Sequence, residues 1–250
     1  NMNWRRRSWL LRTWLASGIA AQNTTMMNGF FDGHLVRRKA RLLPPGVDHE
    51  SFHPQTESRL GMREVCAVPE GATVVAIIAH IVPVKGHATL IRAVASVPDL
   101  VLWIIGRPDD QACMASLVSL VDRLGVSGRI KFLGPVADVP AVLSEVDIFV
   151  LSSESRGEGC PVALLEAMSA GRACVATDVP GSKDLIRSGE NGILVPPGDH
   201  AALSVAIRTL SVQLVMRAAL GKAARETVES SYTLEREATL YETMYQEILT

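Results

Sequence analysis

The sequence of 250 residues lacks several features that would place it in a specialised class of protein. Its four cysteines, Cys66, Cys113, Cys160 and Cys174, are widely scattered and form no CxxC pair, which argues against a disulfide framework or a zinc site. The formal net charge is −1, so no bulk electrostatic attraction to nucleic acid or to an acidic membrane is expected. A reduced, cytoplasmic setting is the simplest interpretation.

The sequence also lacks an apolar run of the roughly 20 residues that a membrane-spanning helix needs. Arg5, Arg6 and Arg7 precede an apolar stretch, as in a signal peptide, but Arg12 interrupts that stretch. The chain begins with Asn1, so we expect an amphipathic helix cut from a longer protein. Apolar residues make up 48% of the chain, which is enough for a sizeable core.

From residue 74 onward, short apolar runs alternate with longer amphipathic ones. The short runs are rich in Val and Ile without strict alternation, which is typical of strands buried on both faces. We predict strands at Val74–Ile81, Leu100–Gly106, Ile130–Leu133, Ile148–Ser152, Ala173–Thr177 and Gly192–Val195. We predict helices at His87–Val97, Ala112–Leu124, Val139–Val146, Pro161–Ala170, Lys183–Arg187, Ala201–Leu210, Arg217–Glu229 and Glu235–Leu249. This alternation predicts an α/β fold with a doubly wound parallel sheet, which binds ligands at the carboxyl ends of its strands.

A segment rich in proline precedes this pattern. Residues 42–54, LLPPGVDHESFHP, have the composition of a linker or an ordered turn. We place an interdomain linker at 44–58, the main domain at 59–230 and a C-terminal helix at 231–250. Residues 1–43 are too few for an independent domain.

The candidate site lies in residues 152–181, SSESRGEGCPVALLEAMSAGRACVATDVPG, which read as strand, loop, helix, turn and strand. Gly159 allows the backbone to approach a ligand closely, and Pro161 suits the first position of a helix. A helix that begins near Cys160 aims its free amides and its positive dipole end into the crevice. Such a terminus suits a diphosphate.

Two acids flank this helix start. Glu158 lies in the loop, and Glu166 follows eight positions later on the helix. Carboxylates accept hydrogen bonds from pairs of hydroxyls, so one acid can face a sugar and the other a ribose. Two glutamates at this spacing are most often solvated surface. Glu166, however, stands in the apolar stretch 162–168, where an unpaired acid is costly, and this favours a functional role.

These residues resemble the E-G-x-P and E-A-M-x-x-G signature of the family 4 (group 1) retaining glycosyltransferases of GT-B fold. Further segments resemble motifs of that family in the same order, over about residues 40–245: LLPPGVDHESFHP at 42–54, IIAHIVPVKGH at 77–87, LWIIG at 102–106, IKFLGPV at 130–136 and SGENGILVPPGD at 188–199. The resemblance implies that the chain carries the Rossmann-like, C-terminal donor-binding half of such an enzyme.

The resemblance implies roles for individual residues. Glu158 matches the glutamate that contacts the hydroxyls of the donor sugar, and Glu166 matches the one that holds the ribose. Lys85 matches the lysine that neutralises the diphosphate leaving group, although a loop lysine alone would be read as solvated. Glu158 and Lys85 are therefore the candidate catalytic residues.

Five more positions complete the implied donor site. Amides near Gly159, Cys160 and Pro161 match the phosphate contacts, with Pro161 itself lacking a donor. The backbone of Val136 matches a position near the nucleobase. His80 stands where the family usually has arginine, whose permanent charge and bidentate fork histidine does not reproduce. This departure implies a weaker stabilisation of the leaving group, or a different donor.

By resemblance, the reaction moves a sugar from a nucleoside diphosphate sugar to a hydroxyl of a sugar, a lipid or another acceptor, with retention of configuration. No metal or other cofactor is required if Lys85 and the helix terminus stabilise the leaving group, and Asp109 and Asp110 fit a turn better than a metal pair. The family's acceptor site lies in an N-terminal domain, which is then missing here or supplied by another chain. A lipid acceptor allows peripheral association with a membrane.

Other functions remain open. The chain could be a nucleotide-sugar-binding module without independent turnover. An NAD-dependent dehydrogenase shares the sheet type, but no GxGxxG follows the first predicted strand. A sugar-nucleotide epimerase of similar fold is disfavoured by the spacing of Glu158 and Glu166. The sequence does not determine the donor base, the sugar, the acceptor or the oligomeric state.

Overall fold

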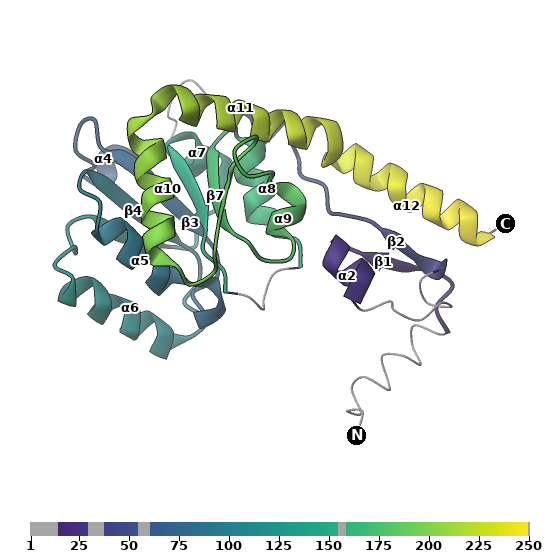
Figure 1. Ribbon diagram of the computed structural model, residues 1–250, viewed down its shortest axis with the longest axis horizontal. Helices are drawn as coiled ribbons and strands as arrows, with labels where there is room; N and C mark the ends of the chain where they lie inside the picture. Colours follow the sequence, from purple (N-terminus) through teal and green to yellow (C-terminus); the bar gives the residue numbers. More distant parts are fainter. Residues whose placement is uncertain (1–14, 30–37, 55–60, 155–158, 250) are drawn as a thin grey trace.

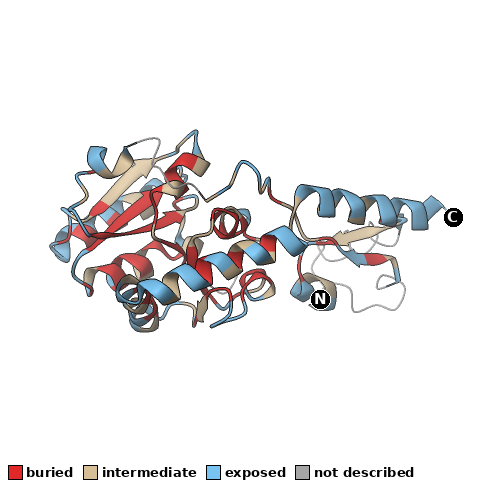
Figure 2. Cartoon of the chain, turned by 90° about the horizontal axis from the view of Figure 1, so that it is seen from above, coloured by how far each residue is buried: buried red, intermediate tan, exposed pale blue. Residues whose placement is uncertain are grey.

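The computed structural model describes residues 15–29, 38–54, 61–154 and 159–249. A larger α/β body and a smaller N-terminal body lie side by side, and the C-terminal helix α12 (Leu234–Leu249) extends from the first toward the second (Figure 1). Most buried residues lie in the larger body, whereas α12 is largely exposed (Figure 2).

A six-stranded parallel sheet forms the centre of the larger body. Its strands lie in the order β5-β4-β3-β6-β7-β8. Their bounds are β3 (Thr73–Ile78), β4 (Leu100–Ile105), β5 (Ile130–Gly134), β6 (Ile148–Leu151), β7 (Ala173–Thr177) and β8 (Ile193–Val195). All six predicted strands are present, and the predicted doubly wound parallel sheet is confirmed.

Both faces of the sheet are buried, which explains the absence of strict alternation in the strand sequences. Along β3, Val75 and Ile77 belong to one apolar cluster, while Val74 and Ala76 belong to another on the opposite face. The covering elements are α4 (Met62–Val65), η1 (Pro83–Lys85), α5 (His87–Ala95), α6 (Gln111–Arg123), α7 (Val139–Ser144), α8 (Val162–Ser169), α9 (Ser182–Leu185), α10 (His200–Val212) and α11 (Leu214–Ser231).

Aspartate side chains begin three of these helices. Asp110, Asp138 and Asp199 each accept a hydrogen bond from a backbone amide in the first turn of α6, α7 and α10, respectively. The cap at Asp110 supports the interpretation of the adjacent acids as part of a turn.

The N-terminal body is built from short elements that the sequence did not predict. β1 (Ile19–Ala21) and β2 (Ala40–Leu42) pair in parallel, and α2 (Thr24–Gly29) follows β1. Helix α12 contacts this pair: a Cβ atom added at Gly18 would lie 2.5 Å from Ile248, and the Arg41 guanidinium donates two hydrogen bonds to Glu247. Helix α12 therefore packs against the described part of the N-terminal body.

The predicted linker runs beside the junction of α11 and α12. Val47 forms an isolated parallel bridge with Thr233, and the amide of Gly46 donates to the Glu237 carboxylate at 2.9 Å. Farther along, Arg225 Nη1 donates to the carbonyl of Phe52 at 3.0 Å. The chain thus passes between the two bodies twice, along neighbouring paths.

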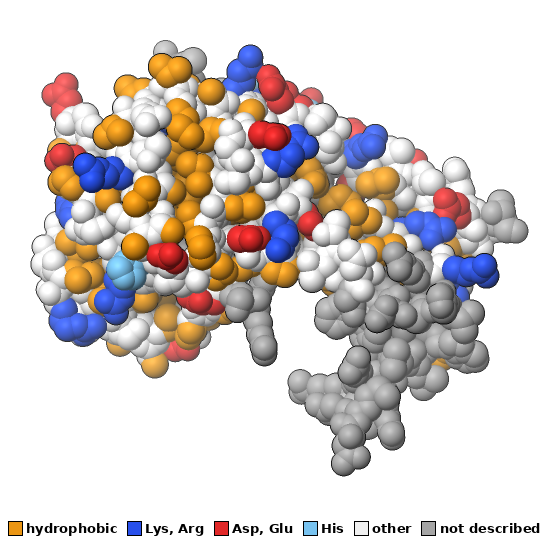
Figure 3. Space-filling model, viewed as in Figure 1, with side chains coloured by type: hydrophobic (Ala, Val, Ile, Leu, Met, Phe, Trp, Pro, Cys, Tyr) orange, Lys and Arg blue, Asp and Glu red, His pale blue; other side chains and the backbone are white. Residues whose placement is uncertain are grey.

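Among the described residues, no single helix is long and apolar enough to cross a membrane. Helices α10 and α11 meet the length and composition criterion only as a pair, and they are bent by 103° relative to each other. Hydrophobic side chains gather on the surface in the region of α10 (Figure 3), and Val205 in α10, together with Val212 and Val215 near this bend, is more than 60% exposed.

Candidate functional site

The strand order reverses between β3 and β6, so their carboxyl ends define the switch point where such sheets bind ligands. The loops that follow these strands contact each other. Ser152 Oγ donates to the carbonyl of Lys85 at 2.9 Å, and the amide of Glu154 donates to Val84 at 2.8 Å. Gly86 has a φ of 66°, and a Cβ atom there would lie 1.9 Å from the Ser152 carbonyl oxygen. The half-buried Lys85 is therefore held at the switch point by both loops.

His80 lies in the loop after β3 and contacts an acid from the loop after β4. Its Nδ1 is in hydrogen-bond contact with Asp109 Oδ2. A carboxylate accepts hydrogen bonds but cannot donate them when ionised, so Nδ1 carries the proton of this bond. Backbone bonds hold the two loops together, including the amide of Ile81 to the carbonyl of Arg107 at 2.8 Å. The position where the family usually has arginine thus holds a histidine whose ring is oriented by Asp109. The sequence did not predict this partner.

Helix α8 begins next to the switch point. Pro161 is its N-cap residue and Val162 its first residue, about one position later than the sequence predicts. The amides of Leu164 and Leu165 both donate to the carbonyl of Pro161, whereas the amides before them have no acceptor within the helix. The start of α8 therefore offers free donors at the edge predicted for a diphosphate.

Gly159, which leads into this helix, is packed tightly. Gly181, in the turn between β7 and α9, has a φ of 89°, and a Cβ atom there would lie 2.4 Å from the Gly159 carbonyl oxygen. The half-buried Cys160 packs against the apolar cluster around α8. The turn 159–161 thus packs against the protein core on one side.

Glu166 lies on α8 between fully buried neighbours. Leu165 and Ala167 are completely buried, whereas Glu166 is half-buried. Burial raises the pKa of the Glu166 carboxyl above its ordinary value of 4.5, because the charged form loses solvation. Its side chain makes no hydrogen bond or ion pair with another described residue. A partly desolvated carboxylate without a partner is suited to accept hydrogen bonds from a ligand.

Among the described residues, Val136 is a predicted site residue that no contact brings to the switch point. Val136 follows β5, the outermost strand at one end of the sheet, and packs against the cluster beneath β4. Glu158 lies outside the described residues. Its assignment stays a prediction from the sequence.

The N-terminal body contributes residues that the sequence did not predict. Asn23 Nδ2 donates to the Gly159 carbonyl at 2.5 Å. The amide and hydroxyl of Thr24 donate to the Asp184 carboxylate at 2.7 and 2.6 Å. Polar residues before an apolar stretch are a signal for the start of a helix, but this signal does not indicate which distant residues the segment contacts.

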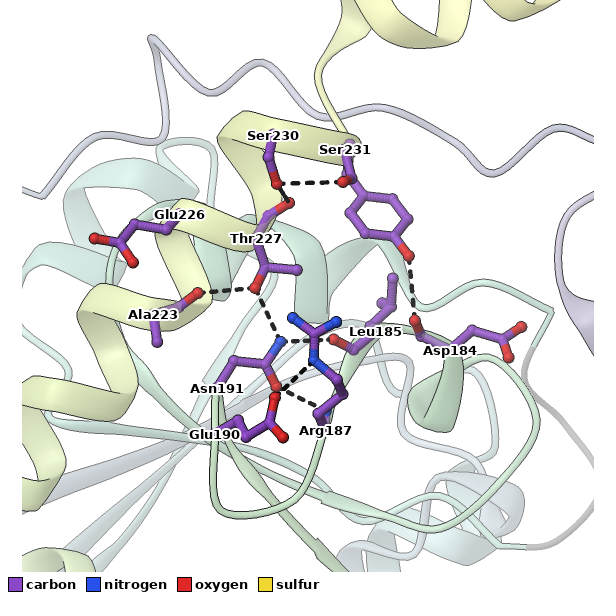
Figure 4. Close-up of a pocket in the computed structure, with 11 residues that line it drawn as sticks. Asp184, Leu185, Arg187, Glu190, Asn191, Ala223, Glu226, Thr227, Ser230 and Ser231 are labelled. Carbon is purple, nitrogen blue, oxygen red and sulfur yellow. Dashed lines mark hydrogen bonds and ion pairs between the residues drawn. The ribbon is translucent and has the colours of Figure 1, made fainter.

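A separate cavity of about 380 Å³ lies between α9, the loop before β8 and α11 (Figure 4). Polar side chains in its lining are hydrogen-bonded within the protein: Asn191 Nδ2 donates to Thr227 Oγ1 at 3.0 Å, and the Tyr232 hydroxyl donates to the backbone carbonyl of Asp184 at 3.1 Å. None of the predicted site residues that the structure describes lines it. The first bond connects the loop before β8 to α11, and the second connects α9 to the residue that follows α11.

The strand order, the glycine-lined loops at the switch point and the start of α8 define a nucleotide-binding α/β domain. The chain belongs to the family of glycosyl transferases group 1, whose model matches residues 60–227.

Individual relatives agree with this assignment. The chain is 34% identical over 167 residues to the lipopolysaccharide core biosynthesis glycosyltransferase LpsE of Rhizobium meliloti, which covers 67% of the chain and 48% of that protein. It is 31% identical over 194 residues to a GDP-mannose-dependent alpha-(1-6)-phosphatidylinositol monomannoside mannosyltransferase of Mycolicibacterium smegmatis, covering 73% of the chain and 50% of that protein. The chain thus spans about half the length of these curated relatives.

The fold agrees with a solved structure as well. HepE from Anabaena, in complex with UDP and glucose, superposes with a TM-score of 0.89 over 96% of the chain and 66% of that protein, at 24% identity. At this level of identity the likeness shows a shared fold.

Proposed function

We propose that the chain is the donor-binding part of a retaining glycosyltransferase that takes its sugar from a nucleoside diphosphate sugar. The observation that carries this proposal is Glu166, a half-buried carboxylate without a partner among the described residues, on the helix that begins at the switch point. Hydroxyls of a ribose would supply the missing hydrogen bonds. The names of the relatives, which act in lipopolysaccharide synthesis or use GDP-mannose, and the UDP and glucose bound to HepE support the same class of donor.

In this proposal the barrier is departure of the nucleoside diphosphate from an oxocarbenium-like sugar, so stabilisation of the leaving group supplies much of the catalysis. Lys85 places a positive charge at the switch point, and the first amides of α8 donate to the phosphates. Glu158 contacts the sugar hydroxyls, and the backbone of Val136 lies near the base. These groups need no metal to neutralise the diphosphate.

His80 has a distinct role from the arginine that it replaces. With Nδ1 donating to Asp109, its Nε2 is the nitrogen left to face a ligand. The imidazole then offers one oriented contact to the diphosphate, whereas a guanidinium would offer a fork of two. We therefore expect weaker stabilisation of the leaving group at this position than arginine would give.

The acceptor site is assigned to an N-terminal domain of which residues 1–43 are the final part. The acceptor is a hydroxyl of a sugar or lipid, and a cytoplasmic location, at the membrane surface for a lipid, stays a prediction. The alternative is a binding module without turnover. Sugar transfer by this chain alone that is lost in Glu158→Ala would exclude that alternative.

A thermal-shift screen with UDP-, GDP- and ADP-sugars tests the donor class. A ligand that binds only the folded chain at 100 times its dissociation constant adds about 2.7 kcal/mol of stability. For a protein of this size, that corresponds to an increase in Tm of about 5–10 °C. The matched control is Glu166→Ala, in which the shift should shrink. Absence of a shift with every nucleotide sugar, or an equal shift in the variant, would contradict the proposal.

A further inference from the structure

Asn23 occupies the contact between the N-terminal body and the proposed donor site. The residue is 2% exposed, and both the oxygen and the nitrogen of its side-chain amide are hydrogen-bonded. Oδ1 accepts the amide of Met26 at 2.7 Å, which caps helix α2, while Nδ2 donates across the contact to Gly159. One side chain therefore starts a helix in one body and holds a carbonyl in the other.

Helix capping alone does not require asparagine. Aspartate, serine and threonine cap helices about as well, because each offers a side-chain oxygen to the first amides. Only asparagine among them also carries an N–H group that can donate to a carbonyl oxygen. The residue type at position 23 is thus explained by the bond to Gly159.

The Gly159 carbonyl is held from two directions. Gly181 packs against it from the core side, as described above, and Asn23 binds it from the N-terminal body. Gln22 also approaches, since its Oε1 would lie 3.1 Å from a Cβ atom at Gly159. The peptide after Gly159 leads directly into Cys160 and Pro161, whose conformation sets the direction of the first free amides of α8.

A second pair of bonds keeps this contact in register. Thr24 donates to the Asp184 carboxylate through both its amide and its hydroxyl. Asp184 belongs to α9, which follows the turn that contains Gly181. The same short segment of the N-terminal body therefore binds both the Gly159 carbonyl and the helix that follows the Gly181 turn.

We infer that Asn23 is a positioning residue of the donor site, which holds the turn 159–161 so that the first amides of α8 face the diphosphate. This inference rests on the proposed function. It adds a residue outside the domain that binds the nucleotide, and it assigns that residue to recognition of the phosphates and not of the nucleoside.

The test is isothermal titration calorimetry of Asn23→Asp with UDP and GDP, and with uridine and guanosine. Aspartate keeps the cap of α2 but cannot donate to Gly159, and it places an acceptor against that carbonyl. We expect the affinity for the diphosphate that the parent chain binds to fall about three- to tenfold, the effect of about one hydrogen bond. The affinity for the corresponding nucleoside should stay within twofold.

Two further variants make the result specific. Asn23→Ser retains a capping oxygen but is too short to reach Gly159, so it should reproduce the loss and serves if the aspartate variant does not fold. Thr25→Ala changes an exposed neighbour in the same helix and should leave both affinities unchanged.

An unchanged ratio of diphosphate to nucleoside affinity in folded Asn23→Asp would overturn this inference while the proposed function stands. An equal loss of both affinities would also overturn it, since that is the pattern of a merely structural residue. If the parent chain binds none of these nucleotides or nucleotide sugars, the proposed function and this inference both fall.

Discussion

Replacement of Glu166 by glutamine should have opposite effects on folding and on donor binding. Glu166 is half-buried on α8, and burial raises the pKa of its carboxyl. Glutamine keeps the shape of the side chain but removes the charge. We therefore expect Glu166→Gln to be more stable than the parent without ligand and to bind a nucleoside diphosphate more weakly.

The gain in stability depends on pH. An unfolded chain ionises this carboxyl near pH 4.5, whereas the folded chain ionises it only at a higher pH. Above pH 4.5 the unfolded state is therefore favoured by ionisation, and the cost to the folded state grows until pH passes the raised pKa. Glutamine avoids this cost, so its advantage should be absent below pH 4.5 and fully present at neutral pH.

The expected magnitudes are measurable. A single stabilising substitution commonly adds about 0.5–2 kcal/mol to the free energy of unfolding. At about 2–4 °C per kcal/mol, Tm should rise by roughly 1–8 °C. Loss of hydrogen bonds from ribose hydroxyls to a charged acceptor should cost about 1.5–3 kcal/mol, which corresponds to a roughly 10- to 150-fold weaker affinity.

The assay is urea unfolding at pH 4 and pH 7 without ligand, followed by calorimetry with UDP and GDP at pH 7. Glu242→Gln, at an exposed position of α12, is the matched control and should change neither quantity. A lower stability of Glu166→Gln at neutral pH would show that the carboxylate is a structural anchor. Unaltered affinity for the nucleotide would refute its assignment to the ribose.

Three other outcomes are expected. Glu158→Ala should weaken binding of the nucleotide sugar, or slow its turnover, while the affinity for the nucleoside diphosphate stays within about twofold of the parent. Calorimetry with both ligands measures this. Equal losses of the two affinities would contradict the assignment of Glu158 to the sugar. His80→Arg should tighten binding of the diphosphate by about two- to tenfold, because a guanidinium adds a charge-assisted contact, and titration with UDP or GDP that shows no gain would contradict it. His87 is 2% exposed, and its burial, with a smaller effect of Lys85, lowers its pKa from 6.5 to about 4. As the pH falls, the unfolded chain therefore takes up this proton before the folded chain does. About 2 kcal/mol of the free energy of unfolding should be lost between pH 7 and pH 5. Urea unfolding of His87→Leu should show a flatter pH dependence than the parent, and an unchanged slope would show that other groups dominate.

Much of the larger body could be predicted from the sequence because its strands are continuous runs of branched apolar residues. The exception in detail is β3, which was expected to reach Ile81 but ends at Ile78. Beyond that point the amides of Ala79 and Ile81 still donate to the carbonyls of Ile105 and Arg107, at the end of β4 and in the loop after it. Residues 79–81 therefore stay close to β4, although they lie outside the strand.

The N-terminal body could not be predicted in the same way. Its strands, with the sequences IAA and ARL, are three residues long and lack the branched runs that identify a strand. Their partners lie far along the chain, since α12 covers them and Asn23 contacts a residue 136 positions away. Local sequence carries no information about such pairings.

For the candidate site, topology alone places Lys85, His80 and the start of α8 at one edge of the sheet. The polar environment of these groups was not predictable, because Asp109 and Asn23 come from other loops. The roles assigned to the site residues remain predictions from the family resemblance.

The two neighbouring passages of the chain between the bodies have a mechanical consequence. Because the linker and the α11–α12 junction are joined by the bridge between Val47 and Thr233, sliding of one body past the other would break that bridge. A rotation about the line through the two passages leaves it intact. The bonds from Asn23 to Gly159 and from Thr24 to Asp184 oppose such a rotation, so the bridge and these bonds together restrict the movement of one body against the other.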